Sequence, residues 1–211
     1  MSDPKRLHAG ERRQQLLEAA LDLFSRRGFN GTTTKEIATA TGVTEAIVFR
    51  HFPTKQALYE AVLDYRHESE EMQEWLAKTR VCMDRNDDAG LLYTIALKIL
   101  EAHQRDARLY RVLLFAALEG HESGLAHHRQ ISVPVYEQLC QYVARRQSEG
   151  AIAAYHPALI LVAIAGMASH LATMTQMFGF DCPTPAEQAA QVFTEIMMRG
   201  IEPKKEQGAS K

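Results

Sequence analysis

A group of side chains between residues 34 and 55 has the chemistry needed to contact phosphate groups and base edges. Short hydroxyl residues at the start of a helix, such as Thr44, present both an oxygen and free backbone N–H groups to phosphates. Nearby cations add charge attraction. We therefore expect double-stranded DNA as a partner. The candidate contact residues are Thr34, Lys35, Thr44, Glu45, Ala46, Phe49, Arg50, His51 and Lys55.

These residues suit different contacts with DNA. Ala46 is small enough to let a helix lie deep in the major groove, and Phe49 can touch a thymine methyl group. Arg50 can bind guanine through two hydrogen bonds, or else a phosphate. The remaining basic side chains are expected to fix the position of the protein on the DNA backbone; they are Lys35, His51 and Lys55.

The elements that carry these residues are two very short helices, predicted over 35–41 and 45–51. Gly42-Val43 permits a sharp turn between them, and Thr33 with Glu36 forms a capping-box pattern at the first. These dimensions are typical of a helix-turn-helix unit, whose second helix enters the major groove. The predicted internal apolar contacts are Ile37, Ala38, Val43, Val48 and Phe52.

Apolar residues recur at helical spacing along nearly the whole chain, so an all-α fold of about nine helices is predicted. A change from short to long helices near residue 55 predicts a DNA-binding domain over 1–54, with three helices, and a larger helical domain over 55–211. The other seven helices are expected over 11–27, from Lys55 into the eighties, and over 89–104, 107–118, 125–148, 157–178 and 185–199.

Charge is distributed unevenly along the 211 residues. The formal net charge is −2, yet residues 1–55 hold nine cations and six anions, a net of +3, which leaves −5 for residues 56–211. The average over the chain thus hides a locally basic segment. Hydrophobic residues make up 46%, enough to bury a sizeable core.

Three widely spaced cysteines without a Cys-x-x-Cys pair, Cys82, Cys140 and Cys182, are typical of reduced thiols in a cytoplasmic protein. The longest apolar run, Ala158–Ala168, is shorter than the roughly 20 residues that span a membrane, so a soluble protein is expected. No pattern indicates a metal or a cofactor.

The ordered series Gly28-Phe29, Thr33-Thr34, Ile37-Ala38, Gly42-Val43-Thr44, Phe49, His51-Phe52 and Lys55 with Leu58 resembles the amino-terminal signature of the TetR family of transcriptional repressors. The resemblance covers residues 12–60. It implies a homodimer that binds a palindromic operator and dissociates when a small molecule enters the larger domain. The implied mechanism is a shift of the helix that begins at Lys55, which changes the separation of the two recognition helices.

Three positions depart from the family pattern. Phe49 stands where a tyrosine is common and cannot donate a hydrogen bond to phosphate. Thr41 replaces the usual alanine before the turn. Glu45 occupies a position often held by lysine or arginine, where a carboxylate either accepts from cytosine or repels the DNA backbone.

The larger domain is expected to bind an apolar or amphipathic small molecule, since such sites combine apolar walls with a few polar groups. His170, within the most apolar predicted helix, is either a polar anchor of this pocket, a core histidine or an interface residue. The candidate ligand contacts are Trp75, Tyr110, Glu119, Tyr136, Met167, His170 and Met174. Apolar faces on the last two helices, Pro157–Phe178 and Pro185–Arg199, predict a four-helix dimer interface.

Two alternatives use the same residues differently. One is an all-α enzyme or small-molecule carrier built around His121, His127 and His128 or around His170, although the histidine spacing matches no catalytic metal motif. The other is a dimerisation protein that has lost its ligand. Because no catalytic signature is present, we do not expect an enzyme.

Overall fold

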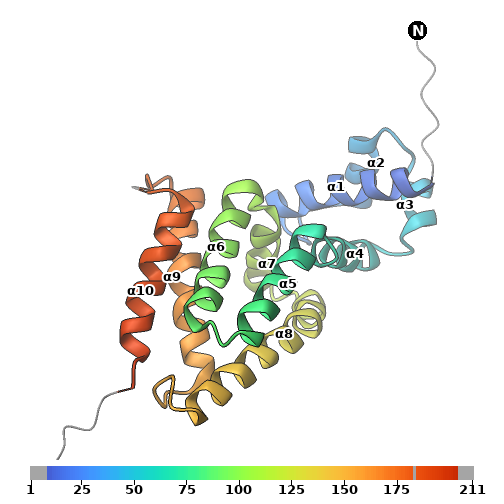
Figure 1. Cartoon of the computed structure of the whole chain (residues 1–211). Helices are drawn as coiled ribbons and strands as arrows, with labels where there is room; N and C mark the ends of the chain where they lie inside the picture. The colour runs from blue at the N-terminus through green and yellow to red at the C-terminus, as the bar shows by residue number, and fades with distance from the viewer. Residues whose placement is uncertain (1–8, 183, 204–211) are drawn as a thin grey trace, which may run out of the picture. The chain divides into compact units, whose positions relative to one another are not determined.

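The computed structural model describes residues 9–182 and 184–203, and all regular elements among them are helices (Figure 1). The predicted all-α fold is confirmed. The ten helices are α1 (Ala9–Arg27), α2 (Thr34–Thr41), α3 (Glu45–His51), α4 (Lys55–His67), α5 (Glu70–Asp84), α6 (Asp88–Asp106), α7 (Arg108–Glu119), α8 (Glu122–Ser148), α9 (Pro157–Phe178) and α10 (Ala186–Ile201).

The helix predicted from Lys55 into the eighties is wrong as a single element, because α4 ends at His67 and α5 begins at Glu70. The Met72 N–H donates to both the carbonyl and the hydroxyl oxygen of Ser69, at 3.0 and 3.4 Å, so Ser69 caps a new helix. This break accounts for the difference between nine predicted helices and ten observed ones.

Several helix boundaries differ from the prediction by one to three residues. α1 begins at Ala9 and α8 at Glu122, where the sequence predicts 11 and 125, and α8 contains Pro134 within one helix. At α10, the helix begins one residue later than predicted, after Pro185, and carries no side-chain cap.

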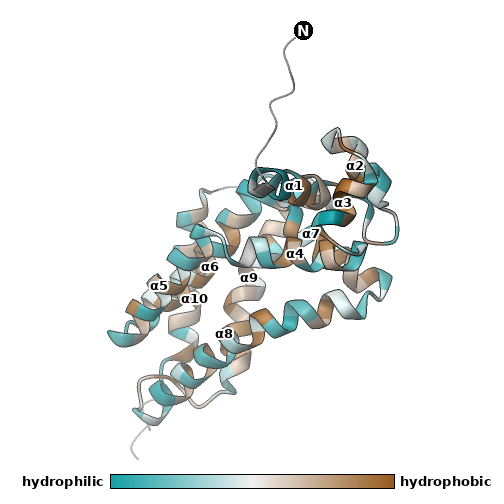
Figure 2. Cartoon of the chain, turned by 90° about the vertical axis from the view of Figure 1, so that its right-hand side faces the viewer, coloured by the Kyte–Doolittle hydropathy of each residue, from teal (hydrophilic) through white to brown (hydrophobic). Residues whose placement is uncertain are grey.

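The chain packs as two units. The amino-terminal unit comprises residues 1–72 and 107–131, and the carboxy-terminal unit comprises 73–106 and 132–211. The predicted boundary between a DNA-binding domain (1–54) and a ligand-binding domain (55–211) is a functional one, and it stays a prediction. Within the amino-terminal unit, α1 packs against α2, α4 and α7, and α2 packs against α3. α1 has both teal and brown segments in Figure 2, as expected of an amphipathic helix.

In the amino-terminal unit the core holds the two short helices to the longer ones. Phe24 of α1 lies 5.2 Å, between ring centroids, from Tyr59 of α4, and both side chains are fully buried. Ile37, Val48 and Leu58 belong to the same buried cluster. The positions of α2 and α3 therefore depend on packing against α1 and α4, because helices of eight and seven residues are too short to be stable alone.

The carboxy-terminal unit has its own core, in which α6 packs against α9 and α10 and α9 packs against α10 (Figure 1). α9 buries Ile160, Leu161, Ile164, Ala168 and Ala172. Among the described residues, α9 is the one helix long and apolar enough to cross a membrane by length and composition, with a mean hydropathy of 1.8.

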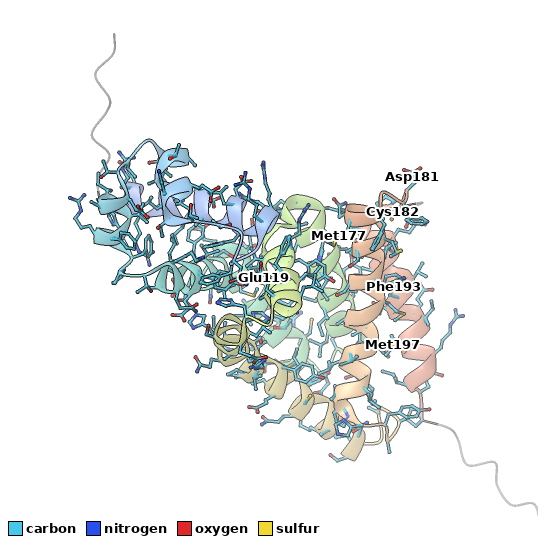
Figure 3. All side chains as sticks on the ribbon, turned by 180° about the vertical axis from the view of Figure 1, so that it is seen from behind. Glu119, Met177, Asp181, Cys182, Phe193 and Met197 are labelled. Atoms are coloured by element: carbon cyan, nitrogen blue, oxygen red, sulfur yellow. The ribbon has the colours of Figure 1, made fainter. Side chains whose placement is uncertain are left out.

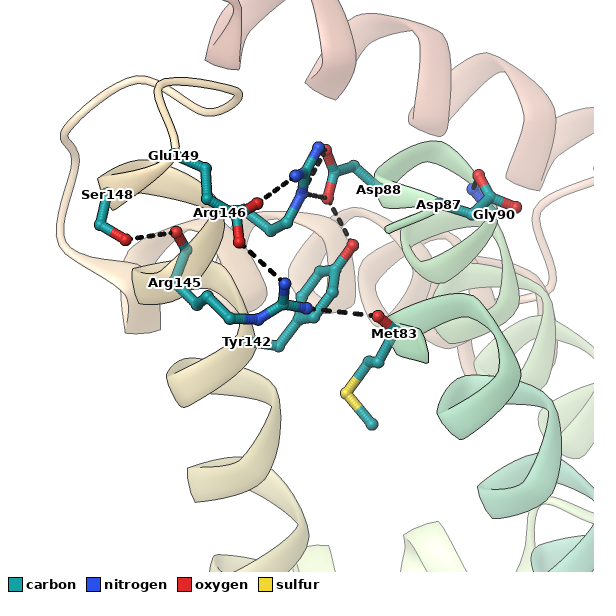
Figure 4. Close-up of polar contacts among 9 residues, drawn as sticks. All are labelled: Met83, Asp87, Asp88, Gly90, Tyr142, Arg145, Arg146, Ser148 and Glu149. Atoms are coloured by element: carbon teal, nitrogen blue, oxygen red, sulfur yellow. Dashed lines mark hydrogen bonds and ion pairs between the residues drawn. The ribbon is translucent and has the colours of Figure 1, made fainter. Parts of the chain in front are cut away.

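A polar network joins the start of α6 to the end of α8 (Figure 4). The Arg146 guanidinium donates to both carboxylate oxygens of Asp88 at 2.9 to 3.2 Å, and the Tyr142 hydroxyl donates to Asp88 at 2.5 Å. The side chains of Asp88 and Arg146 are only 11% and 15% exposed. Glu149 pairs with Arg146 and with Arg145.

We predict that Asp88→Ala lowers the free energy of unfolding by about 3 kcal/mol, because it leaves the Arg146 charge largely buried without its main partner. Urea unfolding followed by circular dichroism measures this. The control is Asp22→Ala, which breaks the exposed Arg26–Asp22 pair of α1 and should cost below about 1 kcal/mol. Equal losses in the two variants would contradict the prediction.

Candidate nucleic-acid interface

The helix-turn-helix unit is formed by α2, the Gly42-Val43 turn and α3. Gly42 has φ +67°, in the left-handed region that favours glycine, and the N–H of Val43 donates to Ala38 O at 3.0 Å. Ile37, Ala38, Val48 and Phe52 are at most 3% exposed, and Val43 packs against their cluster. The predicted internal contacts are thus confirmed.

Capping of the two helices is unequal. The hydroxyl of Thr33 accepts from the Glu36 N–H, and the Glu36 carboxylate accepts from the Thr33 N–H at 2.9 Å, which completes the predicted capping box. The Thr33 N–H and the Thr33 hydroxyl both donate to the Glu36 carboxylate, and these two hydrogen bonds, followed by the charge of Arg27, lower the pKa of Glu36. Thr44 stands at the N-cap of α3 but makes no side-chain cap bond. Its exposed hydroxyl and the N–H groups of Glu45 and Ala46, which have no hydrogen-bond partner among the described residues, can reach an anion.

Five of the nine candidate DNA contacts are exposed: Lys35, Thr44, Ala46, Phe49 and Arg50. Phe49 exposes 43% of its surface, a large value for an aromatic side chain on a helix whose Val48 is fully buried. Arg50 makes no hydrogen bond or ion pair with the residues the structure describes. An exposed apolar ring beside an uncommitted guanidinium suits a contact with bases and phosphates.

The other four candidates are half-buried, and three of them, Thr34, Glu45 and Lys55, form hydrogen bonds within the protein. The Thr34 hydroxyl donates to the Glu45 carboxylate, so these two residues link α2 to α3. Lys55 donates to Phe29 O at 2.9 Å and to Thr32 O at 3.0 Å. Lys55 therefore has a structural role in the free protein, which the sequence pattern did not indicate.

His51 lies at the end of α3, and its buried Nε2 has no hydrogen-bond partner among the described residues. Burial is the main cause that lowers the pKa of His51, and the charges of Arg50, Arg13 and Arg12 lower it further. Arg13 also lies over the Phe52 ring, 5.1 Å from its centroid. The arginines of α1 thus extend the basic surface next to α3; their charge was visible in the sequence, but their position beside His51 was not.

Of the predicted ligand contacts, Tyr110 and Glu119 belong to the amino-terminal unit and the other five to the carboxy-terminal unit. Glu119 accepts from the backbone N–H groups of Phe29 and Asn30. His170 is exposed on α9, which excludes the core-histidine interpretation within one chain. Trp75 donates to Thr94 O at 3.2 Å, and Tyr136 donates to Ala158 O at 3.0 Å.

A pocket of about 170 Å³ lies between α5 and α8 in the carboxy-terminal unit. Apolar side chains and the polar groups of Thr79, Arg80 and Gln138 line it, and none of its lining residues was among the predicted ligand contacts. Its volume is below the roughly 300 Å³ of small ligand sites. The lining residues are Leu76, Thr79, Arg80, Met83, Val135, Gln138 and Leu139.

The histidines of the enzyme alternative have separate partners. His121 Nε2 lies 2.9 Å from Gln56 Oε1, and His127 Nε2 lies 2.8 Å from Asp64 Oδ1. Within the described residues, no three His, Cys, Asp or Glu side chains are grouped so that they could hold a metal ion. Nearby, burial and then the Glu119 carboxylate raise the pKa of Tyr59 to about 12.

This geometry places the chain in the class of all-helical proteins that have an amino-terminal helix-turn-helix domain followed in the sequence by further helices. A family model described as bacterial regulatory proteins, tetR family, matches residues 16–62. Residues 16–62 of the chain thus match the TetR family, as the sequence pattern predicts.

Two curated relatives and one solved structure illustrate the likeness. The HTH-type transcriptional regulator TtgR of Pseudomonas putida is 30% identical over 140 residues, which cover 66% of this chain and 59% of TtgR. The nucleoid occlusion factor SlmA of Marinobacter nauticus is 28% identical over 142 residues, 67% of this chain and 69% of SlmA. The ketosteroid transcriptional regulator KstR2 of Mycobacterium tuberculosis has a TM-score of 0.67 at 18% identity, covering 93% of this chain and 98% of KstR2.

We predict that the free energy of unfolding falls as the pH is lowered below about 6.5. Burial is the largest cause that lowers the pKa of both His51 and His121 from 6.5, so protons bind the unfolded chain more tightly than the folded one over this range. Urea unfolding at several pH values between about 7.5 and about 5.5 measures the slope. The double variant His51→Gln/His121→Gln should show a shallower slope, and an unchanged slope would refute the assignment.

Proposed function

We propose that this protein is a transcriptional repressor that binds a palindromic operator as a homodimer and releases it when a small molecule binds. The observation that carries the proposal is the surface of α2 and α3, where Lys35, Thr44, Ala46, Phe49 and Arg50 are exposed while the opposite face of both helices is buried. These side chains are not part of the buried core of the amino-terminal unit. The match to the TetR family supports the same proposal.

In this proposal α3 lies in the major groove. Ala46 allows close approach, Phe49 contacts a thymine methyl group, and Arg50 binds guanine or a phosphate. The uncapped start of α3 at Thr44 and the basic Lys35 bind phosphates. Glu45 does not contact DNA in this proposal, because its carboxylate accepts a hydrogen bond from the Thr34 hydroxyl and links α2 to α3.

We predict that Arg50→Ala and Lys35→Ala each weaken DNA binding by about tenfold or more. The probe is a duplex that the wild-type protein selects from a random-sequence library, and binding is measured over a range of salt concentrations. Loss of a phosphate contact should also reduce, by about one, the slope of the logarithm of the binding constant against the logarithm of the salt concentration. The reason is that fewer counterions are released.

Arg85→Ala is the matched control for this experiment, because Arg85 is an exposed arginine in the carboxy-terminal unit. It should bind the selected duplex as the wild type does. If Arg85→Ala weakened binding as much as Arg50→Ala, the assignment of the DNA surface to α2 and α3 would be wrong.

The exposed side of α9 and α10 supports the homodimer. Leu159 and Val162 of α9 are 65% and 56% exposed, and Val192 and Ile196 of α10 are 46% and 55% exposed. α9 contains no Asp, Glu, Lys or Arg, and the exposed His170 also lies on it. We propose that a second copy covers this surface, because four apolar helix faces then form a bundle.

We predict that Val192→Glu/Ile196→Glu converts a dimer into a monomer, because it places two carboxylates in the apolar interface. Size-exclusion chromatography with light scattering gives the mass in solution. Val81→Glu on α5, where Val81 is 46% exposed, is the control and should stay dimeric. A wild-type protein that is monomeric, or soluble only with detergent, would contradict the dimer.

We assign the small-molecule site to the carboxy-terminal unit. The pocket between α5 and α8 combines apolar walls with the exposed Arg80, which suits an amphipathic effector, although its 170 Å³ must expand to take one. The free thiols Cys82, Cys140 and Cys182 support a cytoplasmic location. We also propose that the protein is soluble.

A further inference from the structure

The turn between α1 and α2, residues 28–32, is held by side chains from the end of α7 and the start of α4. We propose that Glu119 and His121, at the α7–α8 junction, are positioning residues for DNA binding: they fix this turn, and with it the start of α2. This inference rests on the proposed DNA-binding function. All of the residues involved belong to the amino-terminal unit.

The first contact consists of two hydrogen bonds from the turn to the Glu119 carboxylate, which we call the Glu119 clasp. Glu119 Oε2 accepts from the N–H of Phe29 at 3.0 Å and from the N–H of Asn30 at 3.2 Å. Both N–H groups lie in a turn and lack partners in a helix, so the carboxylate supplies acceptors that the local backbone does not. Hydrogen bonds to an ionised acceptor are stronger than those between neutral groups. Figure 3 shows Glu119 at the end of α7.

Gly28 makes this close approach possible. Its φ is +71°, and a Cβ atom there would lie 2.0 Å from Glu119 Oε1. Glycine is therefore needed twice, for the left-handed backbone and for the space that the carboxylate occupies. The Thr32 hydroxyl donates to Gly28 O at 2.9 Å and closes the turn from the other end.

The second contact is with the Phe29 ring. His121 stacks on it with ring centroids 4.0 Å apart, and Lys55 Nζ lies 4.1 Å from the same centroid. Two groups this near the centroid must occupy opposite faces of the ring. Lys55 also donates to the carbonyls of Phe29 and Thr32, so the turn is fixed through its N–H groups, its carbonyls and its one large side chain.

The turn leads directly into the DNA-binding surface. Thr33, the residue after it, caps α2, and the exposed Lys35 lies in the first turn of that helix. Glu119 and His121 come from the part of the chain predicted to respond to the small molecule, residues 55–211. Movement of the α7–α8 junction would therefore displace the start of α2 without any direct contact between ligand and DNA.

The test compares Glu119→Ala with Leu118→Ala, a control on the same helix whose side chain is 85% exposed. Amide hydrogen exchange followed by NMR should show faster exchange at Phe29 and Asn30 only in Glu119→Ala. At a temperature where both variants are fully folded, Glu119→Ala should bind the duplex selected by the wild type about tenfold more weakly, and Leu118→Ala within about twofold. Glu119→Gln, which keeps an acceptor oxygen, should lie between Glu119→Ala and the wild type.

A double-mutant cycle tests the close approach by itself. Gly28→Ala should destabilise the protein more than Gly150→Ala, because Gly150 has φ +74° but nothing within 4 Å of its added Cβ. In the Glu119→Ala background, Gly28→Ala and Gly150→Ala should lower the free energy of unfolding by similar amounts, since only the backbone strain remains. Additive effects would show that the carboxylate does not contact Gly28.

Wild-type DNA affinity in Glu119→Ala, with unchanged exchange at Phe29 and Asn30, would overturn the positioning role. If the wild type selects no duplex, the proposed function fails and the positioning role fails with it. The exchange and double-mutant results would then still establish whether the clasp exists. The two failures are therefore distinguishable.

Discussion

The packing of α2 and α3 on each other and on α1 and α4 is the constraint on which the rest of this structure depends. Neither short helix can exist alone, and both are held by a few fully buried side chains, among them Ile37, Val48 and Leu58. Because those residues face inward, Ala46, Phe49 and Arg50 must face outward. A surface suited to DNA is thus a direct result of where the core lies.

Charge acts locally in this chain. The net charge of −2 would argue against a nucleic-acid partner if it were spread evenly, but the segment up to residue 55 is basic. The structure adds that not every cation in this segment is available: Lys55 binds backbone carbonyls and Arg27 pairs with Glu36. Binding through a few well-placed contacts is therefore expected, with bulk electrostatic attraction a smaller part.

Local patterns in the sequence predicted the DNA-binding part well. The Thr33–Glu36 capping box, the Gly42 turn and the inward residues Ile37 and Val48 are all set by interactions within about ten residues. The role of Glu119 could not be predicted in this way, because its partners Phe29 and Asn30 lie 90 and 89 residues away. The sequence predicts Glu119 only as a candidate ligand contact.

The same limit explains two other outcomes. His170 lies in a very apolar helix, yet which side of that helix faces the core depends on α6 and α10, and the side with His170 is exposed. The apolar residues of α10, which the sequence predicts to form one face, lie on two sides of the helix. Ala189 is buried in the core, whereas Val192 and Ile196 are exposed. Phe193 and Met197 of α10, labelled in Figure 3, are partly buried against the core.

Hydrogen exchange with mass spectrometry, on the wild-type protein with and without its selected duplex, tests the central claim most directly. The account predicts that DNA slows exchange in residues 33–51 and leaves the core helices α6, α9 and α10 unchanged. Protection confined to residues 73–106 and 132–203, with none in α2 and α3, would contradict it.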